Sequence, residues 1–230
     1  MIGVFDSGAG GIAVTRELRS LYPRADIIFF RDRLGAPYGT KSKEELKRLV
    51  AHDIRTLLEF GASEILMACC TASTVHSELD EELQGISIPI IEPTARAAVS
   101  VTKQGKIGVI ATNMTASSHA FKNAIHSIDN SITVYEWQTQ PLVALVEGGA
   151  RDENLTKREI QIIKATLRDV IPSDIDTLIL GCTHFPLIEK TISSILPWVK
   201  TVSSAREGAR ALKICDTGRG KSIYLENKRR

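Results

Sequence analysis

The chain of 230 residues holds 29 lysines and arginines against 27 aspartates and glutamates, which gives a formal net charge of +2. A surface that follows nucleic-acid phosphates needs a marked excess of positive charge, so we expect no nucleic-acid partner. Hydrophobic residues make up 43% of the chain and charged residues 24%. These globular proportions exclude the collagen-like, coiled-coil and disordered classes.

The sequence carries no sign of a membrane or an export signal. No apolar run approaches the roughly 20 residues that cross a bilayer, and no cationic stretch precedes a longer apolar one at the N-terminus. Four cysteines, two of them adjacent, are too few for a disulfide-built scaffold. We therefore expect no membrane partner and a cytoplasmic protein with reduced thiols.

Short β-branched or aromatic runs alternate with amphipathic stretches, which is the pattern of a mostly parallel sheet covered by helices. In chain order the predicted strands cover 2–5, 27–30, 64–68, 89–91, 107–110, 132–135, 177–181 and 199–202. Ser42 and Glu45 predict a capping box for a helix over 42–60, which ends at Gly61. A later helix over 155–171 is predicted to bury four apolar residues, Ile160, Ile163, Leu167 and Val170.

The two halves of the chain resemble each other at two points. Ile2-Gly3-Val4 recurs as Ile107-Gly108-Val109, and residues 66–69 are echoed by 179–182. Because buried parallel strands are all short and apolar, chance similarity is the alternative to duplication. Duplication predicts two similar three-layer α/β domains with mostly parallel sheets and the active site in the cleft between them. The predicted domains are residues 1–94 plus 205–230, and residues 95–204.

The residues that follow the predicted strands are chemically consistent with one another. In open α/β sheets, ligands bind beyond the carboxyl ends of the strands. Small hydroxyls, backbone amides freed by glycine and two thiols suit a small polar ligand that carries a carboxylate. These residues are Asp6-Ser7-Gly8, Asp32 with Pro37-Tyr38-Gly39, Cys69-Cys70-Thr71 and Cys182-Thr183-His184.

The four cysteines divide into two kinds. A cysteine at the end of a buried strand is by default a small hydrophobe, and we prefer this interpretation for Cys70 and Cys215. Cys69 and Cys182 favour a functional role, because each ends a predicted strand and has a threonine within two residues. His184 follows Cys182 by two residues, so on an extended segment the two side chains share one side and the imidazole can tune the thiol.

Two cofactor sites compete with this interpretation. The segment from Gly8 to Ala13, with Asp32 downstream, has the spacing of a dinucleotide fingerprint, but the carboxylate of Asp6 would repel the pyrophosphate. A zinc site built from three of the cysteines and His184 is poorly spaced, since adjacent cysteines rarely serve one tetrahedral centre. We therefore expect no cofactor and no metal.

The ordered motifs resemble those of the cofactor-independent glutamate racemases of the aspartate/glutamate racemase superfamily. The similarity runs from Ile2 to about Ala209, and although each motif alone is weak, the ordered set is specific. The matching segments are Gly3-Val4-Phe5-Asp6-Ser7-Gly8-x-Gly10-Gly11, Ala36-Pro37-Tyr38-Gly39, Ala68-Cys69-x-Thr71-Ala72-Ser73, Glu92-Pro93, Ile107-Gly108-Val109-Ile110-x-Thr112, Pro141-Leu142 through Val146-Glu147, and Leu180-Gly181-Cys182-Thr183-His184-Phe185-Pro186-Leu187.

The resemblance implies an amino-acid racemase, an isomerase that acts on glutamate without pyridoxal phosphate. Cys69 and Cys182 would be the paired acid and base, Asp6 would assist Cys69, and Glu147 with His184 would assist Cys182. The resemblance also implies D-glutamate supply for peptidoglycan, cell wall biogenesis and cell shape, and it is compatible with a homodimer. The substrate contacts that it implies are Asp6, Ser7, Pro37, Tyr38, Gly39, Cys70, Thr71, Thr183 and His184.

Racemisation independently asks for two such groups. Inversion of a stereocentre by proton exchange needs one base to remove the α-hydrogen and an acid on the opposite face to return one. A free thiol ionises near pH ~8.5, so a cysteine base needs its pKa tuned at neutral pH.

Three positions depart from the family pattern. Cys70 replaces an asparagine, Arg31 replaces the glycine before Asp32, and Ser203 replaces the aspartate before Ser204. The exchange at Cys70 removes an amide that can donate and accept hydrogen bonds to substrate, and the exchange at Ser203 removes a carboxylate, so these two bear on affinity, substrate choice or turnover. The alternative is a diverged paralogue that racemises another acidic amino acid, or one that binds an amino acid or a protein partner without catalysis.

Overall fold

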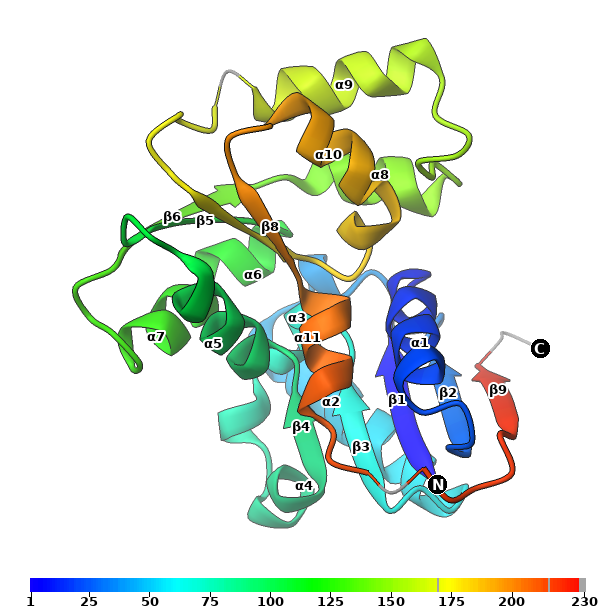
Figure 1. The fold of residues 1–230 in the computed structure, drawn as a ribbon. Helices are drawn as coiled ribbons and strands as arrows, with labels where there is room; N and C mark the ends of the chain where they lie inside the picture. Colours follow the sequence, from blue (N-terminus) through cyan, green and yellow to red (C-terminus); the bar gives the residue numbers. More distant parts are fainter. Residues whose placement is uncertain (169, 215, 228–230) are drawn as a thin grey trace.

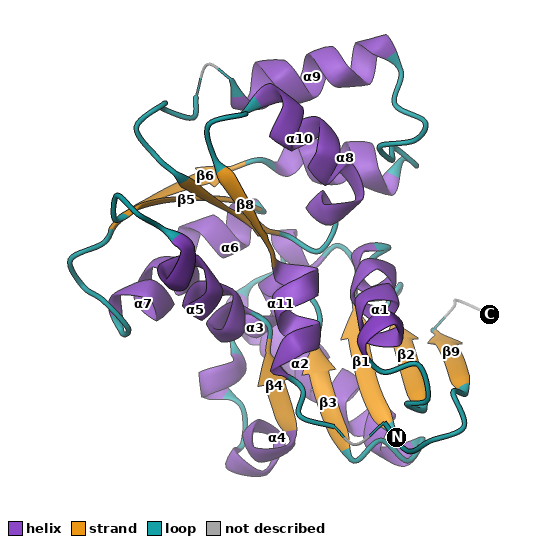
Figure 2. Cartoon of the chain, in the orientation of Figure 1, coloured by secondary structure: helices purple, strands orange, loops and turns teal. Residues whose placement is uncertain are grey.

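The computed structural model describes residues 1–168, 170–214 and 216–227, so Cys215 lies outside the described residues. Nine strands within these ranges form two sheets in which every strand pair is parallel (Figures 1 and 2). The first sheet has the order β4-β3-β1-β2-β9, and the second has the order β6-β5-β7-β8. The fold class is therefore α/β with two sheets, as the sequence pattern predicts.

The strands of the first sheet are β1 (Ile2–Asp6), β2 (Ile27–Arg31), β3 (Glu64–Met67), β4 (Ser87–Pro89) and β9 (Ser222–Glu226). Those of the second sheet are β5 (Lys106–Ala111), β6 (Thr133–Gln138), β7 (Thr177–Gly181) and β8 (Lys200–Ser203). The central strands β1 and β7 are buried along their whole length, as expected where helices cover both faces of a parallel sheet.

The helices pack on both faces of the two sheets. The long ones are α1 (Gly10–Leu21), α2 (Lys43–Glu59), α5 (Ile91–Val101), α8 (Gln140–Glu147), α9 (Lys157–Leu167) and α11 (Ser204–Ala211). The shorter ones are α3 (Cys70–Ser73), α4 (Glu81–Ile86), α6 (Asn113–Ser117), α7 (Ala120–His126) and α10 (Glu189–Ile195), with single turns η1 (Tyr38–Thr40), η2 (His76–Glu78) and η3 (Phe185–Ile188).

One hydrophobic cluster connects the two sheets. It contains Val4 of β1, Ala95 of α5, Ala205 of α11 and Ile179 of β7, whereas two further clusters lie under α2 and under α8 to α10. The helices α5 and α11 are thus shared packing partners of both halves (Figure 1). The predicted domain boundary at residues 94 and 95 falls within α5, and the division into two domains stays a prediction.

Each predicted strand and helix has a counterpart in the structure, although several ends are shifted. The strand predicted over 89–91 lies at Ser87–Pro89, because Ile91 already begins α5. The edge strand β9 was not predicted. Ser42 Oγ accepts a hydrogen bond from Glu45 N, 3.2 Å apart, and Gly61 has a φ of +88°, which confirms where α2 begins and ends. The capping box is only half formed among the described residues, because the Glu45 side chain pairs with Lys41 Nζ and not with Ser42 N.

The later helix is shorter than predicted. It runs from Lys157 to Leu167 and begins at a capping box made by Thr156 and Glu159. Ile163 and Leu167 are buried as predicted, but Ile160 and Val170 are 37% and 48% exposed. The burial of these two was wrongly predicted, because α9 is an outer helix that contacts α8 and α10 along a narrow stripe and ends before Val170 (Figure 1).

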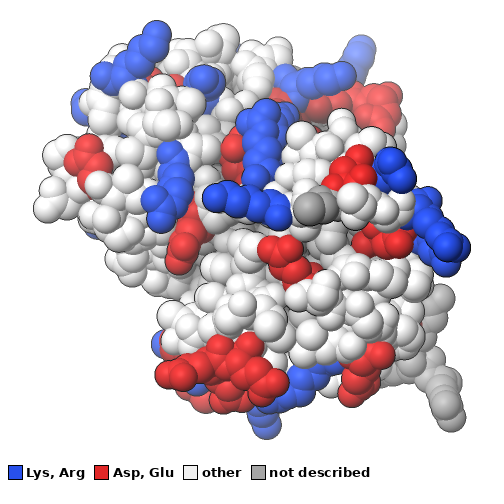
Figure 3. Space-filling model, turned by 60° about the horizontal axis from the view of Figure 1, so that its bottom comes forward, with Lys and Arg blue, Asp and Glu red and all other residues white. Residues whose placement is uncertain are grey.

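No helix in the described ranges has both the length and the apolar composition that crossing a membrane requires. The face shown in Figure 3 carries lysine and arginine side chains interspersed with aspartate and glutamate. This mixture accords with the small net charge of the whole chain.

Candidate active site

A cavity of about 240 Å³ lies where the carboxyl ends of β1, β2, β3 and β7 meet. Its wall contains every predicted site residue except Asp6, which lies fully buried behind it. A larger hollow of about 720 Å³ near α5, α6 and α7 contains none of the predicted site residues and no thiol. The predicted residues in the smaller cavity are Ser7, Pro37, Tyr38, Gly39, Cys69, Cys70, Thr71, Glu147, Cys182, Thr183 and His184.

Glycines let the loop after β1 approach the other half of the molecule closely. A Cβ atom added at Gly8 would collide with Glu147 Oε1, and one added at Gly10 would collide with Thr183 Oγ1. The amide of Gly8 is already used, because it donates to Asp6 Oδ1 over 2.7 Å. This loop therefore packs against side chains of the second half, and does not leave the open phosphate cradle of a dinucleotide fingerprint.

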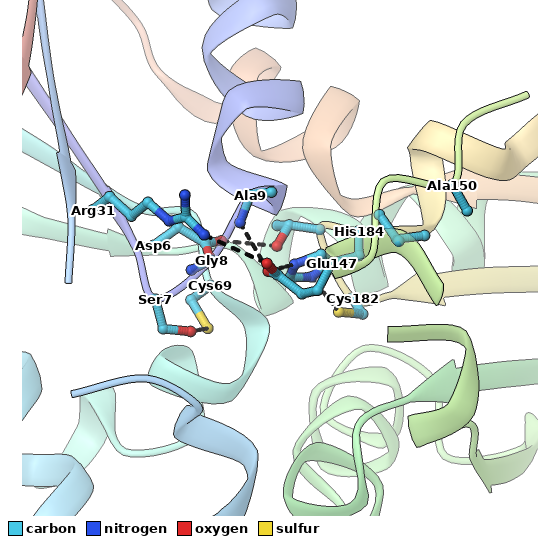
Figure 4. Close-up of polar contacts among 12 residues, drawn as sticks. Asp6, Ser7, Gly8, Ala9, Arg31, Cys69, Glu147, Ala150, Cys182 and His184 are labelled. Carbon is cyan, nitrogen blue, oxygen red and sulfur yellow. Dashed lines mark hydrogen bonds and ion pairs between the residues drawn. The ribbon is translucent and has the colours of Figure 1, made fainter. Parts of the chain in front are cut away.

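Cys69 lies two residues beyond the end of β3 and directly precedes α3. Its side chain is 7% exposed, and its Sγ lies 3.9 Å from Ser7 Oγ (Figure 4). Burial, and after it the charge of Asp6, raises the pKa of the Cys69 thiol to about 12, against the lowering effect of the Ala72 and Thr71 amides and Ser7. In this structure Cys69 is therefore held as a thiol at neutral pH.

Cys182 follows β7 and lies beside a histidine and a carboxylate (Figure 4). Its Sγ is 3.3 Å from His184 Nδ1, and His184 Nε2 makes a hydrogen bond with Glu147 Oε1. The hydrogen bond from His184 lowers the pKa of Glu147 to about 2, so this carboxylate is ionised and can only accept. A neutral His184 then carries its proton on Nε2 and offers Nδ1 as the acceptor for the Cys182 thiol.

Burial also raises the pKa of the Cys182 thiol well above its usual value. The imidazole of His184, 3.3 Å away, can nevertheless accept the proton of the Cys182 thiol, because a thiolate beside a protonated histidine is a favourable ion pair. The second thiol thus has a built proton acceptor within hydrogen-bond reach.

Asp6 bridges the two halves. Its Oδ2 accepts a hydrogen bond from Thr183 Oγ1 over 2.8 Å, while none of its hydrogen bonds in the described residues reaches Cys69. Burial raises the pKa of Asp6, although the nearby His184 opposes that rise. Asp6 therefore acts on Cys69 only through its charge, and acts on the segment beside Cys182 by direct contact.

Further residues of the cavity were not among the predicted site residues. Arg31 Nη2 lies 3.4 Å from Glu147 Oε2, and its Nη1 lies 3.7 Å from Glu226 Oε1. Thr112 Oγ1 lies 3.0 Å from Thr71 Oγ1, which connects the residue after β5 with α3. The position of Arg31 directly at the end of a predicted strand was the available signal. The remaining cavity residues outside the predicted set are Gly8, Arg33, Ala36, Gln140 and Val143.

Two of the three departures from the family pattern are buried beside the shared core. Cys70 is 2% exposed and belongs to the hydrophobic cluster that connects the sheets, although it also touches the cavity. Ser203 is buried, and its Oγ accepts from the amide of Arg206 at the start of α11. Ser203 is therefore a helix N-cap, a role that serine fulfils as well as aspartate does.

Comparison with known proteins identifies the family. The profile of the Asp/Glu/Hydantoin racemase family matches residues 2–212. The chain is 39% identical over 212 residues to a glutamate racemase of Exiguobacterium sibiricum, which covers 90% of this chain and 76% of that protein. A glutamate racemase of Persephonella marina is 39% identical over 213 residues, covering 92% of this chain and 81% of the relative.

Solved structures agree with the sequence comparison. A glutamate racemase isoform from Bacillus anthracis superposes with a TM-score of 0.87 at 34% identity, covering 98% of this chain and 87% of that chain. A Francisella tularensis glutamate racemase in complex with D-glutamate gives a TM-score of 0.85 at 28% identity, covering 100% and 88%. The predicted family and the predicted amino-acid racemase class are thereby confirmed, and the chain belongs to the Asp/Glu/Hydantoin racemase family.

Proposed function

We propose that this chain interconverts L- and D-glutamate, with Cys69 and Cys182 as the two acid–base groups. The observation that carries the proposal is the arrangement of the two buried thiols. Each follows a strand of a different sheet, and both line one cavity. Relatives that are named glutamate racemases, including structures with D-glutamate and L-glutamate bound, support glutamate as the substrate.

In the proposed reaction, one thiolate removes the α-hydrogen and the opposite thiol returns a proton to the other face of the carbanion. When Cys182 is the base, its proton moves to His184 Nδ1, and ionised Glu147 stabilises the imidazolium. When Cys182 has acted as the base, Cys69 has given its proton to the carbanion and is left as the thiolate, which is the base for the reverse direction; Ser7 and the amides of α3 are the groups that favour this thiolate. The net change is inversion at Cα, with no oxidation and no leaving group.

The cavity wall supports recognition of a dicarboxylate. Arg31 and Arg33 contribute positive charge and Thr71 and Thr112 contribute hydroxyls, whereas Thr183, whose hydroxyl donates to Asp6, can contribute its backbone amide. Their donors can hold carboxylates and lower the energy of the enolate-like carbanion in a site that excludes water. Asp6, Ser7, Pro37, Tyr38, Gly39 and Cys70 complete the proposed substrate site.

The proposed product is a D-amino acid, and we assign its use to peptidoglycan synthesis and thereby to cell shape. Deletion of the gene should make a host with no second source of D-glutamate dependent on added D-glutamate. Restoration of growth by the wild-type chain, but not by Cys182→Ser, would support this assignment. Growth restored equally by both would contradict it.

The direct test is exchange at Cα in deuterium oxide, with purified protein, a chelator and no pyridoxal phosphate. A panel of L- and D-glutamate, aspartate and neutral amino acids separates glutamate racemisation from the diverged-paralogue alternative. We expect deuterium to enter glutamate as it racemises. Deuterium exchange in aspartate alone would make aspartate the substrate in place of glutamate. Binding of an amino acid without any exchange would refute catalysis.

A further inference from the structure

The hydroxyl of Tyr38 lies between two buried carboxyl groups, neither of which lines the cavity. Tyr38 Oη is 2.7 Å from Asp32 Oδ2 and also makes a hydrogen bond with Asp53 Oδ2. Tyr38 and Asp32 are each 1% exposed, and Asp53 is fully buried. Asp53 belongs to α2, within the same buried stripe as Val50 and Leu57.

The number of protons in this cluster decides its chemistry. A phenol has one hydrogen, so Tyr38 can donate to only one of the two carboxyl groups. An ionised carboxylate has no hydrogen to give and would leave the other contact as a repulsion between oxygens. One of the two aspartates must therefore be a carboxylic acid that donates to Tyr38.

The hydrogen bonds show which aspartate carries the proton. Asp32 Oδ1 accepts from Gly35 N over 2.9 Å and from Asn227 Nδ2 over 2.6 Å, so with Tyr38 it has three donors, as an ionised carboxylate requires. Asp53 Oδ1 has no hydrogen-bond partner among the described residues. A buried carboxylate with an unpaired oxygen is costly, whereas the neutral acid avoids most of that cost.

The surroundings of Asp53 favour the neutral acid as well. Burial comes first among the causes that raise its pKa well above the usual value, followed by the charge of Asp32 and, after the opposing bond from Tyr38, the charge of Asp6. Of these titratable neighbours, Asp6 belongs to β1, Asp32 to the loop after β2 and Tyr38 to η1. The two that carry charge are acidic, so each opposes ionisation of Asp53.

We infer that Asp53 is a buried carboxylic acid that donates to Tyr38, which in turn donates to Asp32, and that this relay positions the Pro37–Gly39 wall of the cavity. The inference rests on the proposed function for its effect on catalysis. Asp53 is a positioning residue, since it touches Tyr38 and does not line the cavity. Asn227, which directly follows β9, holds the same loop from the other side through Leu34 N and Asp32.

Proton linkage tests the protonation state without any substrate. Between pH ~5 and pH ~7 the unfolded Asp53 is ionised, so unfolding of the wild type releases one proton that unfolding of Asp53→Asn does not. The unfolding equilibrium constant of the wild type, divided by that of Asp53→Asn, should rise about tenfold per pH unit. Denaturant titrations across this range measure the ratio.

The matched control is Glu59→Gln, at the exposed end of the same helix. The ratio of the wild-type unfolding constant to that of Glu59→Gln should not change with pH. A flat ratio for Asp53→Asn would overturn the inference. If the ratio of the wild-type unfolding constant to that of Asp32→Asn rose tenfold per pH unit, the proton would lie on Asp32 and not on Asp53. This result would overturn the inference as well. Neither result depends on whether the protein racemises glutamate.

Kinetics test the positioning role. Asp53→Leu should raise the KM for glutamate about fivefold with little change in kcat, the equivalent of one lost hydrogen bond. Asp53→Asn, whose amide still donates to Tyr38, should restore the wild-type KM. An Asp53→Leu enzyme with a wild-type KM would refute the positioning role, whereas absence of racemisation in the wild type would refute the proposed function and leave the linkage result intact.

Discussion

The two thiols occupy equivalent places in the two halves but differ in their neighbours. Cys69 follows β3 and Cys182 follows β7, and burial raises the pKa of both. Among the described side chains, Ser7 with its hydroxyl at 3.9 Å is the hydrogen-bond partner of Cys69, whereas Cys182 has His184 at 3.3 Å. Parallel strands thus supply the matching positions, and the loops that follow them supply different acid–base chemistry.

The residues that surround Cys182 come from both halves of the chain. Glu147 Oε1 contacts His184 and also accepts from Ala9 N over 2.9 Å, while Asp6 holds Thr183 next to the thiol. No comparable set of side chains surrounds Cys69 in the described residues. We therefore expect the half-reaction that begins at Cys182 to depend on specific side chains, and the one that begins at Cys69 to depend on backbone amides and exclusion of water.

Replacement of either thiol should have the largest effect. Cys69→Ser and Cys182→Ser should each reduce racemisation by at least about 10³-fold, since neither acid–base role can be covered by the remaining thiol. Circular dichroism of L- and D-glutamate solutions follows the loss of optical activity. Cys70→Ser, at a thiol that the proposed reaction uses neither as acid nor as base, should still racemise glutamate even where its KM changes, and wild-type rates in either of the first two variants would contradict the assignment.

Replacement of His184 should slow proton transfer at Cys182 more than proton transfer at Cys69. His184→Gln should slow the half-reaction that begins at Cys182 by about 10² to 10³-fold, because the thiol loses its proton acceptor. The opposite half-reaction should fall less. Because the two enantiomers have equal free energies, kcat/KM for racemisation falls equally in both directions, so the measurement is the entry of solvent deuterium into L- and into D-glutamate before inversion. Equal losses in this exchange for both enantiomers would show that His184 serves the two thiols alike.

Removal of the Asp6 charge should lower the pKa of the Cys69 thiol. In Asp6→Asn the pKa of Cys69 should fall below its value of about 12, because one of the causes that raise it is absent. Alkylation by iodoacetamide should then become faster at Cys69 across alkaline pH. Site-resolved mass spectrometry reports each cysteine separately, and an unchanged pH profile at Cys69 would refute the electrostatic link.

The smallest effect concerns acid stability. Glu147 has its pKa lowered to about 2, so its bond to His184 stabilises the folded state above the unfolded glutamate pKa of about 4.3 and is lost as pH falls toward 2. The stability difference between the wild type and Glu147→Gln should therefore shrink over this interval. Because Glu147 is half-exposed, solvent keeps the effect modest. A difference that is constant with pH would contradict the lowered pKa.

The parts of the site that follow strand ends could be predicted from the sequence. Cys69, Cys182 and their threonines follow short apolar runs, and the carboxyl ends of parallel strands are where ligands bind. The contact between Asp6 and Thr183 could not be predicted, because it joins residues 177 positions apart and depends on how the two halves pack.

The missed features had only weak local signals. β9 contains a run of just three apolar residues, Ile223, Tyr224 and Leu225, and so short a run does not by itself identify a strand. Asp53 does have a weak signal, since it interrupts the apolar stripe of α2 at a buried position. Its partner Tyr38 lies on another element, and only the tertiary structure brings the two together.

The most direct test of the central claim is hydrogen exchange at Cα in the two single-thiol variants. In deuterium oxide, Cys69→Ser and Cys182→Ser should each exchange one enantiomer of glutamate without inverting it, and the two variants should act on opposite enantiomers. Proton NMR resolves the loss of the α-hydrogen. Exchange of the same enantiomer by both variants, or inversion by either one, would contradict two thiols acting from opposite faces.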